Sequence, residues 1–377
     1  MSEVLYAYLV RPDALSVWKY DEVKKRLDWY YKVMRGERPA KYRIVKRIPI
    51  PNDYGDLTRL SEDILWDIHN ELRKEFLNRW SNIKKGVEDL DDYPEVERSF
   101  LDLKIEIVDR MISPCRLCEH KCGAMRREGK RGICGLDITV RVATAFLHLG
   151  EEAPLVPSGT IFFTGCSFKC VFCQNWDISQ NPYNGESVTP EVLARIAVNL
   201  ASRGARNINY VGGNPDQSMH VIIESLRYMD VNIPLLWNSN MYLTKESMEL
   251  LLDLIDIWLP DFKYGSDECA LRLSRVRNYF EIVSRNHKMA YDFGDNIIIR
   301  HLVLPNHLEC CTKRVIDWIA ENIPNVLVNV MDQYRPEYLV ARNPEKFRDI
   351  NRRLRRNEIE EAYGYAERKK LCFRPIS

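Results

Sequence analysis

Short apolar runs alternate with helix-forming segments through the second half of the chain. The runs lie at 160–163, 208–211, 234–237, 257–259, 297–304 and 326–330. Strands separated by helices at this spacing form βαβ units, so the pattern predicts an α/β fold with six parallel strands. Both an open doubly wound sheet and a partial (β/α)6 barrel fit this pattern. In either fold the chemistry gathers where the strands end at their carboxyl termini.

Polar residues mark where the intervening helices begin. Thr189-Pro190-Glu191 combines an N-cap, a proline at the first helical position and an acid in the first turn. Asn214-Pro215-Asp216 has the same form, and we expect it to start the next helix. Thr244 and Thr312 are the expected N-caps of helices over 245–255 and 313–322.

The first 112 residues have a different pattern. Apolar residues recur every four positions from Leu60 to Phe76, which predicts one face of a helix over 59–85. Helices are also expected over 21–34 and 95–111, with an extended connection over 38–53. The region 1–112 is therefore predicted to be mainly helical and to cap one end of a catalytic domain.

Composition and charge narrow the functional classes. The 55 basic and 54 acidic residues nearly cancel, so no overall field draws the chain to nucleic acid or to an acidic membrane. No apolar stretch is long enough to span a bilayer, and the N-terminus lacks the features of a leader. We expect a cytoplasmic protein. The basic helical tail 336–377 is a solvated helix face or a contact for phosphate or an acidic partner.

The eleven cysteines carry the strongest chemical signal. An odd number in a cytoplasmic chain argues against a disulfide framework, and close spacing argues for metal. Two groups stand close together between positions 115 and 173. The remaining cysteines are Cys269, Cys310, Cys311 and Cys372. They are expected to be buried thiols, although Cys310 and Cys311 could reach the active site.

Cys166, Cys170 and Cys173 follow the first parallel strand with the spacing C-x3-C-x2-C. Three thiolates on one loop can hold three irons of a [4Fe–4S] cluster and leave the fourth iron open. A cluster used only for electron transfer normally has four cysteines, whereas an open position admits an exogenous ligand. A zinc knuckle or a set of free thiols is the alternative.

This arrangement resembles the radical S-adenosylmethionine (SAM) superfamily. The resemblance implies a partial barrel, a [4Fe–4S] cluster on the three cysteines, and SAM bound to the open iron. It implies reductive cleavage of SAM to a 5′-deoxyadenosyl radical, which abstracts hydrogen from a substrate. Phe172, the aromatic residue before the third cysteine, would lie by the adenine.

Later elements resemble pyruvate formate-lyase activating enzyme and PflX-like proteins. By this resemblance the glycine element at the second strand would receive the methionine amino group, with an asparagine where the family has glutamate. The residues carried over as SAM contacts are Gly212, Gly213, Asn214, Ser239, Asn240, Asp261, Lys263 and Arg300. The segment 331–334 lacks the histidine that activating enzymes carry there. Asp261, Lys263 and Arg300 could instead be surface charge pairs.

The second cysteine group has the spacing C-x2-C-x3-C-x11-C and consists of Cys115, Cys118, Cys122 and Cys134. Four thiolates with glycine-rich turns form a closed site, which is typical of structural zinc or a fully ligated cluster. Neighbouring lysines and arginines would offset the thiolate charge. The spacing leaves a second [4Fe–4S] cluster, zinc and unmetallated thiols open.

These observations predict four regions and one main function. A four-Cys segment over 113–158 and a radical SAM partial barrel over 159–335 lie between the helical region and the basic tail. The expected activity is that of an activating-enzyme-like oxidoreductase that acts on a protein or peptide and receives electrons from a flavodoxin- or ferredoxin-like donor. Modification of RNA or a small metabolite is the alternative, and a non-catalytic metal-binding scaffold is a remote one.

Overall fold

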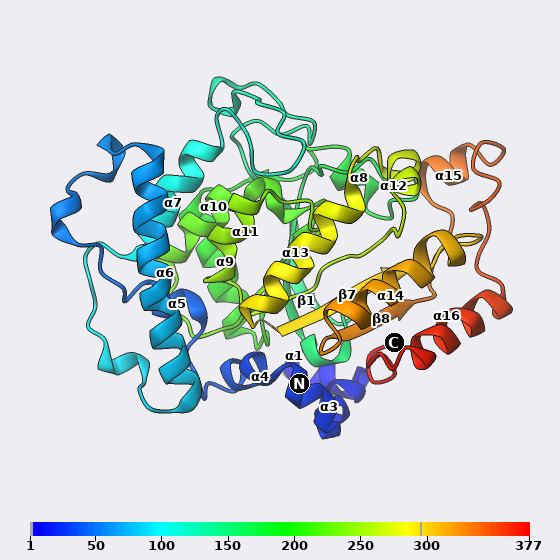
Figure 1. The fold of residues 1–377 in the computed structure, drawn as a ribbon, viewed down its shortest axis with the longest axis horizontal. Coiled ribbons are helices and arrows are strands. Elements are labelled where there is room, and N and C mark those ends of the chain that lie inside the picture. The colour runs from blue at the N-terminus through cyan, green and yellow to red at the C-terminus, as the bar shows by residue number, and fades with distance from the viewer. Residues whose placement is uncertain (1–2, 295) are drawn as a thin grey trace.

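One sheet organises the molecule (Figure 1). The computed structural model describes residues 3–294 and 296–377. The strands are ordered β3-β1-β2-β4-β5-β6-β7-β8, and all pairs from β2 to β8 are parallel. The predicted six parallel strands and partial barrel are confirmed. The strands are β1 Arg141–His148, β2 Ser158–Phe163, β3 Glu186–Ser187, β4 Ile208–Gly212, β5 Leu235–Trp237, β6 Ile257–Trp258, β7 Asn296–Leu302 and β8 Leu327–Met331.

Helices connect consecutive parallel strands. Two of the predicted N-caps are present, because the Thr189 and Thr244 hydroxyls accept hydrogen bonds from the amides of Val192 and Ser247, each at 3.3 Å. The helices of this part of the chain are α8 Trp176–Ser179, α9 Pro190–Ser202, α10 Met219–Ser225, α11 Lys245–Leu252, α12 Asp267–Ser274, α13 Tyr279–Phe293 and α14 Lys313–Asn322.

Two other predicted helices begin where expected, but without a side-chain cap. A 3-10 turn, Pro215–Ser218, begins after Asn214 and runs into α10, while Asn214 Oδ1 accepts from the Asn240 amide at 3.1 Å instead of from its own helix. Helix α14 spans the predicted 313–322, and Thr312, at its N-cap position, ends a π-helical turn, Leu308–Thr312. The Thr312 hydroxyl lies 2.9 Å from His301 Nε2 rather than on the helix amides. In both places a residue distant in sequence takes the side-chain oxygen that local sequence assigns to a cap.

The N-terminal region is mainly helical, with some differences from the prediction. The predicted helix over 21–34 is broken at Leu27, and the predicted extended connection contains a short helix. The long helix begins after Ser61, whose hydroxyl accepts from the Ile64 amide at 3.4 Å. The helices are α1 Glu3–Val10, α2 Asp13–Ser16, α3 Asp21–Arg26, α4 Asp28–Met34, α5 Lys41–Val45, α6 Glu62–Lys85 and α7 Phe100–Met111.

Helices α3 and α4 lie at the end of the sheet where the parallel strands begin (Figure 1). The Tyr30 amide donates to Asn296 Oδ1 at 2.7 Å, and the Trp29 indole donates to Asp256 Oδ1 at 2.8 Å. Trp18 packs in the same core as Leu236 and other buried strand residues. This end of the sheet is therefore closed, and the opposite end, where the parallel strands finish, is left for the cysteine loops.

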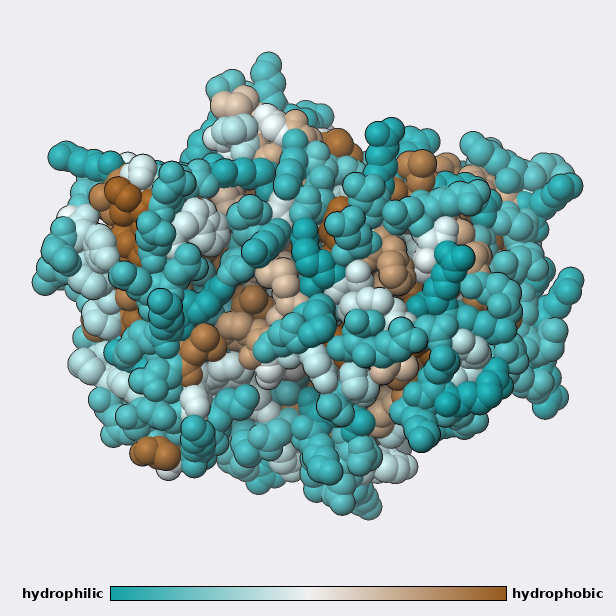
Figure 2. All heavy atoms as spheres, viewed as in Figure 1, coloured by the Kyte–Doolittle hydropathy of each residue, from teal (hydrophilic) through white to brown (hydrophobic). Residues whose placement is uncertain are grey.

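The basic tail forms α15 Tyr338–Arg342 and α16 Arg356–Arg368. Half of its eight arginines have ion pairs, among them Arg352 with Glu358 at 2.7 Å and Arg368 with Glu361 at 3.0 Å. On the face drawn in Figure 2, hydrophilic side chains predominate and hydrophobic ones occur in small separate groups. Among the described residues, no helix is long and apolar enough to cross a membrane.

A buried charge cluster joins the N-terminal helices to the barrel. Asp253, after α11, lies 2.6 Å from Lys104 Nζ in α7 and 3.1 Å from Arg73 Nε in α6. Burial works to raise the pKa of Asp253, but the two cations outweigh it and hold the pKa below its ordinary value. The carboxylate is therefore charged at neutral pH and pairs with cations from two different helices, and Glu249 also pairs with Arg73.

We predict that Asp253→Asn lowers the free energy of unfolding by about 3 kcal/mol or more, because it leaves the buried Lys104 uncompensated. The matched control is Asp230→Asn, since the Asp230 side chain is 96% exposed beside Lys46 and its loss should change stability by about 0.5 kcal/mol or less. Chemical denaturation of both variants measures the difference. Equal losses would contradict a structural role for the cluster.

Candidate active site and cysteine groups

The loop that carries Cys166, Cys170 and Cys173 follows β2 at the carboxyl end of the sheet. The Lys169 and Val171 amides each donate at 2.9 Å to carbonyls at the end of α12, those of Ser274 and Leu273. Gly165 has a φ of 77°, and a Cβ there would lie 3.1 Å from the carbonyl oxygen of Cys134. Main-chain groups therefore lie against the loop on both sides: carbonyls of α12 bind its amides, and the Cys134 carbonyl packs against Gly165.

Each of the three sulfurs has a polar neighbour. The Phe168 amide donates to Cys166 Sγ at 3.3 Å. Cys170 Sγ lies 2.9 Å from Ser274 Oγ, and Cys173 Sγ lies 3.3 Å from Ser179 Oγ. Amide and hydroxyl donors of this kind stabilise a thiolate once a metal has displaced its proton.

The three thiols need a cation to ionise. Burial raises the pKa of Cys166 and Cys173 above the ordinary value, and raises that of Cys170 to about 12. The Lys263 ammonium works against this rise at Cys170 and Cys173. Metal binding deprotonates thiols of this kind. The donor set therefore fits an iron–sulfur cluster held by three cysteines.

Gly212 and Gly213 end β4 beside this loop. Gly212 has a φ of 119°, and a Cβ there would lie 2.2 Å from the Phe163 amide nitrogen. A Cβ on Gly213 would lie 2.1 Å from the carbonyl oxygen of Gly165. Both glycines are thus needed for the close approach of β4 to the cysteine loop, whether or not they also receive a ligand.

Asn214 and Asn240 link the ends of β4 and β5 to the cysteine loop. Asn214 Oδ1 accepts from the Asn240 amide at 3.1 Å. The Asn240 side chain donates to Ser167 Oγ at 3.3 Å and lies 3.8 Å from Cys166 Sγ. Ser239 lies in the turn after β5. Its hydroxyl accepts from the Met241 amide at 2.8 Å and so stabilises that turn. The structure therefore brings these predicted residues together at the carboxyl ends of β4 and β5, beside the cysteine loop.

Asp216 is a buried carboxylate that the sequence analysis did not assign to the site. Its Oδ1 accepts from the Trp237 indole at 2.9 Å, whereas its Oδ2 has no hydrogen-bond partner within the described part of the chain. Burial raises the pKa of Asp216 to about 6. It stands two positions after Asn214, which occupies the family's glutamate position. Asn214 and Ser239 lie near this carboxyl and work to lower its pKa, but Oδ2 is left under-satisfied, which fits an ammonium group.

Asp261, Lys263 and Arg300 form one charged network at the ends of β6 and β7. Asp261 pairs with Lys263, and its Oδ1 accepts from Arg300 Nε at 3.1 Å. Burial works to raise the pKa of Asp261, and the charges of Arg300 and Lys263 outweigh it and lower the pKa. Arg300 also donates to Asn238 Oδ1. These residues are partly buried and mutually paired, rather than scattered surface charges.

Phe172 is 5% exposed, and its ring meets the ring of Tyr334 edge-on at 5.8 Å between centroids. Tyr334 belongs to the segment after β8 that lacks the activating-enzyme histidine. The two aromatic residues pack together at the wall of the site. The expected contact of Phe172 with adenine stays a prediction.

The four-Cys segment lies directly against this loop. His120 Nε2 donates to the Ser167 carbonyl at 3.0 Å. The Glu119 amide donates to the Tyr242 carbonyl at 3.0 Å, and Cys118 forms a β-bridge with Leu243. The segment is the loop at the top of Figure 1, above α10 and α11. The two cysteine groups are therefore neighbours in space, although the sequence places a strand between them.

The four thiols of this segment are gathered around a glycine turn and a buried cation. A Cβ on Gly132 would lie 3.0 Å from Cys122 Sγ and 3.5 Å from Cys134 Sγ. The buried Arg126 Nη1 lies 4.0 Å from Cys115 Sγ, and its Nη2 has no partner among the described residues. A buried guanidinium facing thiols favours an anionic metal–thiolate centre.

The comparisons with known proteins agree with the geometry. The model of the radical SAM superfamily matches residues 160–319. An uncharacterised protein of Methanocaldococcus jannaschii is 45% identical over 357 residues, which cover 92% of this chain and 98% of that protein. A second uncharacterised protein of this archaeon is 24% identical over 279 residues, which cover 67% of this chain and 79% of that protein. The chain belongs to the radical SAM superfamily.

Solved structures show a more distant similarity to this radical SAM protein. Streptococcus suis SuiB bound to its precursor peptide SuiA has 18% identity and a TM-score of 0.40, and covers 55% of this chain. A domain of pyruvate-formate lyase-activating enzyme from Bacteroides vulgatus has 12% identity and a TM-score of 0.32, and covers 49% of this chain and 89% of that domain. The chain spans 46% of the SuiB chain.

The superfamily implies a [4Fe–4S] cluster and SAM. The three buried thiols with their donors fit the cluster, and the free carboxylate oxygen of Asp216 fits the ammonium of SAM. In that site Cys166, Cys170 and Cys173 would hold three irons. The cluster would supply the electron that cleaves SAM. The protein's own groups exclude water and set the charge around this centre.

The sequence analysis missed a third cysteine group. It treats Cys269, Cys310 and Cys311 as buried thiols, but the structure brings their sulfurs together with His307. The available signal was the pattern His-x2-Cys-Cys after the fifth parallel strand. Cys372 stands apart from the group, in a β-bridge with Leu327.

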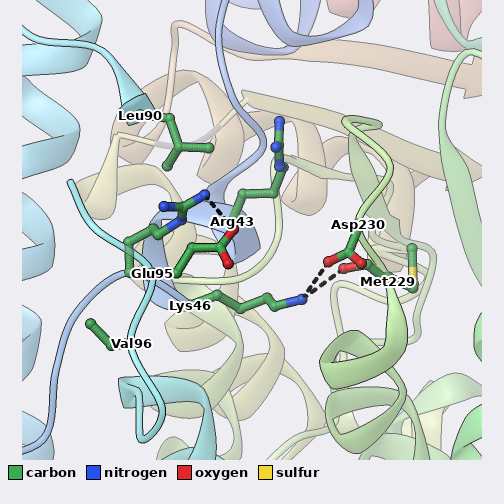
Figure 3. Close-up of a pocket in the computed structure, with 8 residues that line it drawn as sticks. Arg43, Lys46, Leu90, Glu95, Val96, Met229 and Asp230 are labelled. Carbon is green, nitrogen blue, oxygen red and sulfur yellow. Dashed lines mark hydrogen bonds and ion pairs between the residues drawn. The ribbon is translucent and has the colours of Figure 1, made fainter. Parts of the chain in front are cut away.

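A surface hollow lies away from all three cysteine groups. It is lined by residues of α5, the segment before α7 and the turn before β5 (Figure 3). Lys46 points toward Asp230, with Nζ 3.1 Å from Oδ1, and Arg47 pairs with Glu95 at 3.0 Å. Two of its three cations are thus paired with carboxylates, and we assign it no role in the chemistry.

We predict that Gly213→Ala disrupts the radical SAM cluster site, because the added methyl group would lie 2.1 Å from the carbonyl oxygen of Gly165 and displace the cysteine loop. The anaerobically reconstituted variant should lose most of the iron bound at this site. Gly364→Ala in α16 is the control, since its new methyl group meets only the end of Arg368 at 3.4 Å. Iron analysis and electron paramagnetic resonance check the result. Wild-type iron in Gly213→Ala would contradict this packing constraint.

Proposed function

We propose that this radical SAM protein cleaves SAM reductively and uses the 5′-deoxyadenosyl radical to abstract hydrogen from a protein or peptide, as an activating-enzyme-like oxidoreductase. The observation that carries the proposal is the three-thiol loop at the carboxyl end of β2, with the polar ends of β4, β5, β6 and β7 beside it. The likeness of these strand ends to activating enzymes supports a macromolecular substrate.

The residues around the loop have separable roles in this proposal. The Asp216 carboxylate, together with Asn214, accepts the methionine ammonium. The Arg300 and Lys263 cations, balanced by Asp261, offset the negative charge of the thiolates and of a methionine carboxylate. The burial of the loop excludes water, which protects a radical from quenching.

The charge distribution favours a protein substrate over RNA. Binding to RNA requires lysine and arginine side chains that are available to phosphates. In the tail, however, Arg352, Arg356 and Arg368 are paired with glutamates. The aromatic residues beside the cysteine loop are also engaged, because Trp176 and Tyr338 stack on each other at 5.4 Å. RNA and small metabolites remain outcomes of the test below.

We further propose that the four-Cys segment holds a second [4Fe–4S] cluster rather than zinc. The support for a cluster is its place in the structure. The buried Arg126 Nη1 lies 4.0 Å from Cys115 Sγ, and His120 of this segment donates to the Ser167 carbonyl of the SAM-binding loop. A redox centre in this segment would therefore lie beside the first cluster, where zinc would have no redox role.

A second cluster here would suit electron delivery to the first. The segment meets the cysteine loop through His120 and Ser167, and its Cys122 is exposed. Exposed basic residues surround it, including Lys121, Lys130 and Arg131. An acidic flavodoxin- or ferredoxin-like donor would be attracted to such a surface.

We predict that Cys166→Ala abolishes formation of 5′-deoxyadenosine, because it removes an iron ligand of the SAM-binding cluster. The protein is reconstituted anaerobically, reduced with dithionite and supplied with SAM, and the nucleoside is quantified. Cys372→Ala is the control and should retain wild-type formation, since Cys372 lies outside the three cysteine groups. Cleavage that survives in Cys166→Ala would rule out this ligand assignment.

The same assay identifies the class of substrate. An extract of the organism that encodes the chain is added to the wild-type reaction after treatment with protease, with ribonuclease or with neither. A protein substrate should stimulate nucleoside formation in untreated and ribonuclease-treated extract but not after protease. Loss after ribonuclease would favour RNA, and stimulation by the low-mass fraction alone would favour a metabolite.

We predict that Cys118→Ser lowers bound iron by about four atoms per chain and leaves the signal of the SAM-binding cluster in place. Iron and sulfide analysis, with electron paramagnetic resonance in the presence of SAM, measures both effects. Cys372→Ser controls for the loss of a thiol. If the variant instead loses one zinc and no iron, the segment holds zinc and the second cluster is excluded.

A further inference from the structure

Four potential ligands converge at a place distinct from both iron–sulfur groups. Cys269 lies in α12, and His307, Cys310 and Cys311 lie in the segment after β7. Their ligand atoms all lie within 4.8 Å of one another. Cys310 Sγ is 3.7 Å from Cys269 Sγ and 3.8 Å from Cys311 Sγ. His307 Nδ1 is 3.5, 3.2 and 3.9 Å from the sulfurs of Cys269, Cys310 and Cys311.

These separations match the edges of a tetrahedron around zinc. Zn–S bonds of about 2.3 Å and Zn–N bonds of about 2.0 Å give edges of roughly 3.8 Å between sulfurs and 3.5 Å from sulfur to nitrogen. Hydrogen bonding alone does not explain the convergence. A neutral imidazole has one acceptor nitrogen with one lone pair, so His307 Nδ1 can accept from one thiol and not from three.

A π-helical turn places the side chains of the two adjacent cysteines on the same side of the chain. Neighbouring residues of an α-helix do not share a face, but Cys310 and Cys311 lie in the π-helical turn Leu308–Thr312. Gly265, on the opposite segment, permits close approach. A Cβ there would lie 2.8 Å from the Cys311 carbonyl oxygen and 3.0 Å from that of Cys310.

The surroundings of His307 are those of a metal ligand. Its Nε2 lies 3.5 Å from Asp349 Oδ2, and Arg272, which also approaches this nitrogen at 3.1 Å, pairs with Asp349. A metal-bound histidine commonly has a carboxylate at its second nitrogen, which fixes the ring orientation. When Nδ1 binds metal, Nε2 carries the ring proton and donates it to Asp349, and Arg272, which can only donate, then bonds Asp349 alone.

The group is largely buried. Cys311 is 1% exposed, His307 5% and Cys269 9%, and Cys310 is partly buried. Four protein ligands with no open position are typical of structural zinc, whereas a catalytic zinc keeps a position for water or substrate. Three thiolates and one imidazole are also the ligand types that favour zinc over magnesium or calcium.

We propose that Cys269, His307, Cys310 and Cys311 bind one structural zinc ion. The metal would join α12 to the segment after β7. The far end of α12 accepts the Lys169 and Val171 amides of the cysteine loop, and its Ser274 hydroxyl contacts Cys170 Sγ. The zinc therefore supports the position of the SAM-binding cluster from outside the active site. The site itself does not depend on the proposed substrate or on the second cluster.

Zinc content of the purified protein tests the site without reference to activity. Wild type, Cys310→Ser and the control Cys372→Ser are purified anaerobically without added metal and analysed by inductively coupled plasma mass spectrometry. We expect Cys310→Ser to contain one zinc per chain fewer than both of the others. A zinc content equal to that of wild type would overturn the proposal. The four-Cys segment is unchanged in all three proteins, so any metal there cancels in the comparison.

A rescue pair separates ligation from folding. His307→Ala should lose the zinc, whereas His307→Cys should retain it, because four thiolates also form a structural zinc site. In wild type, removal of one zinc by a chelator should make Cys269, Cys310 and Cys311 alkylatable, as measured by peptide mass spectrometry. Free alkylation of these three cysteines in native wild type, with no release of zinc, would overturn the proposal even if every variant misfolds.

Discussion

The loop with Cys166, Cys170 and Cys173 depends on main-chain contacts from both sides. Carbonyls at the end of α12 bind its amides, and the carbonyl of Cys134 approaches Gly165 at the other side. Ionising three thiols in this environment costs free energy, and metal binding offsets that cost. The positions of the thiols must therefore be set by the fold before the metal binds. The rigid parallel sheet and these flanking segments supply that geometry.

The same contacts connect the three cysteine groups to one another through the SAM-binding loop. The four-Cys segment touches the loop through His120 and Ser167, and α12 extends from the loop to Cys269. A displacement in either flanking segment therefore reaches the SAM-binding loop directly. Closed metal sites on both flanks would stiffen the one loop that must keep an open iron.

Local pattern predicted the features that depend on nearby residues. The six parallel strands, the long helix α6 and the three-cysteine loop follow from periodicity and spacing within short windows. The group of Cys269, His307 and Cys310 was missed because its members come from two segments that meet only in the folded chain. The helix over 313–322 was predicted correctly, but, for the same reason, Thr312 and Asn214 do not cap their helices, since His301 and the Asn240 amide take their side-chain oxygens. The sequence analysis treated Asp216 only as part of a helix start. Its burial and its under-satisfied Oδ2, which distinguish it as a site residue, are visible only in the folded chain.

The contrast between open and closed coordination explains how one chain can use cysteine in different ways. The C-x3-C-x2-C loop offers three thiols and cannot complete the coordination of a cubane, so it requires a ligand from outside the chain. The Cys3His group completes a tetrahedron and leaves nothing for a substrate to bind. In this arrangement SAM chemistry belongs to the loop at the end of β2. A metal at the Cys3His group would hold α12 against that loop, and a cluster in the four-Cys segment would deliver electrons to it.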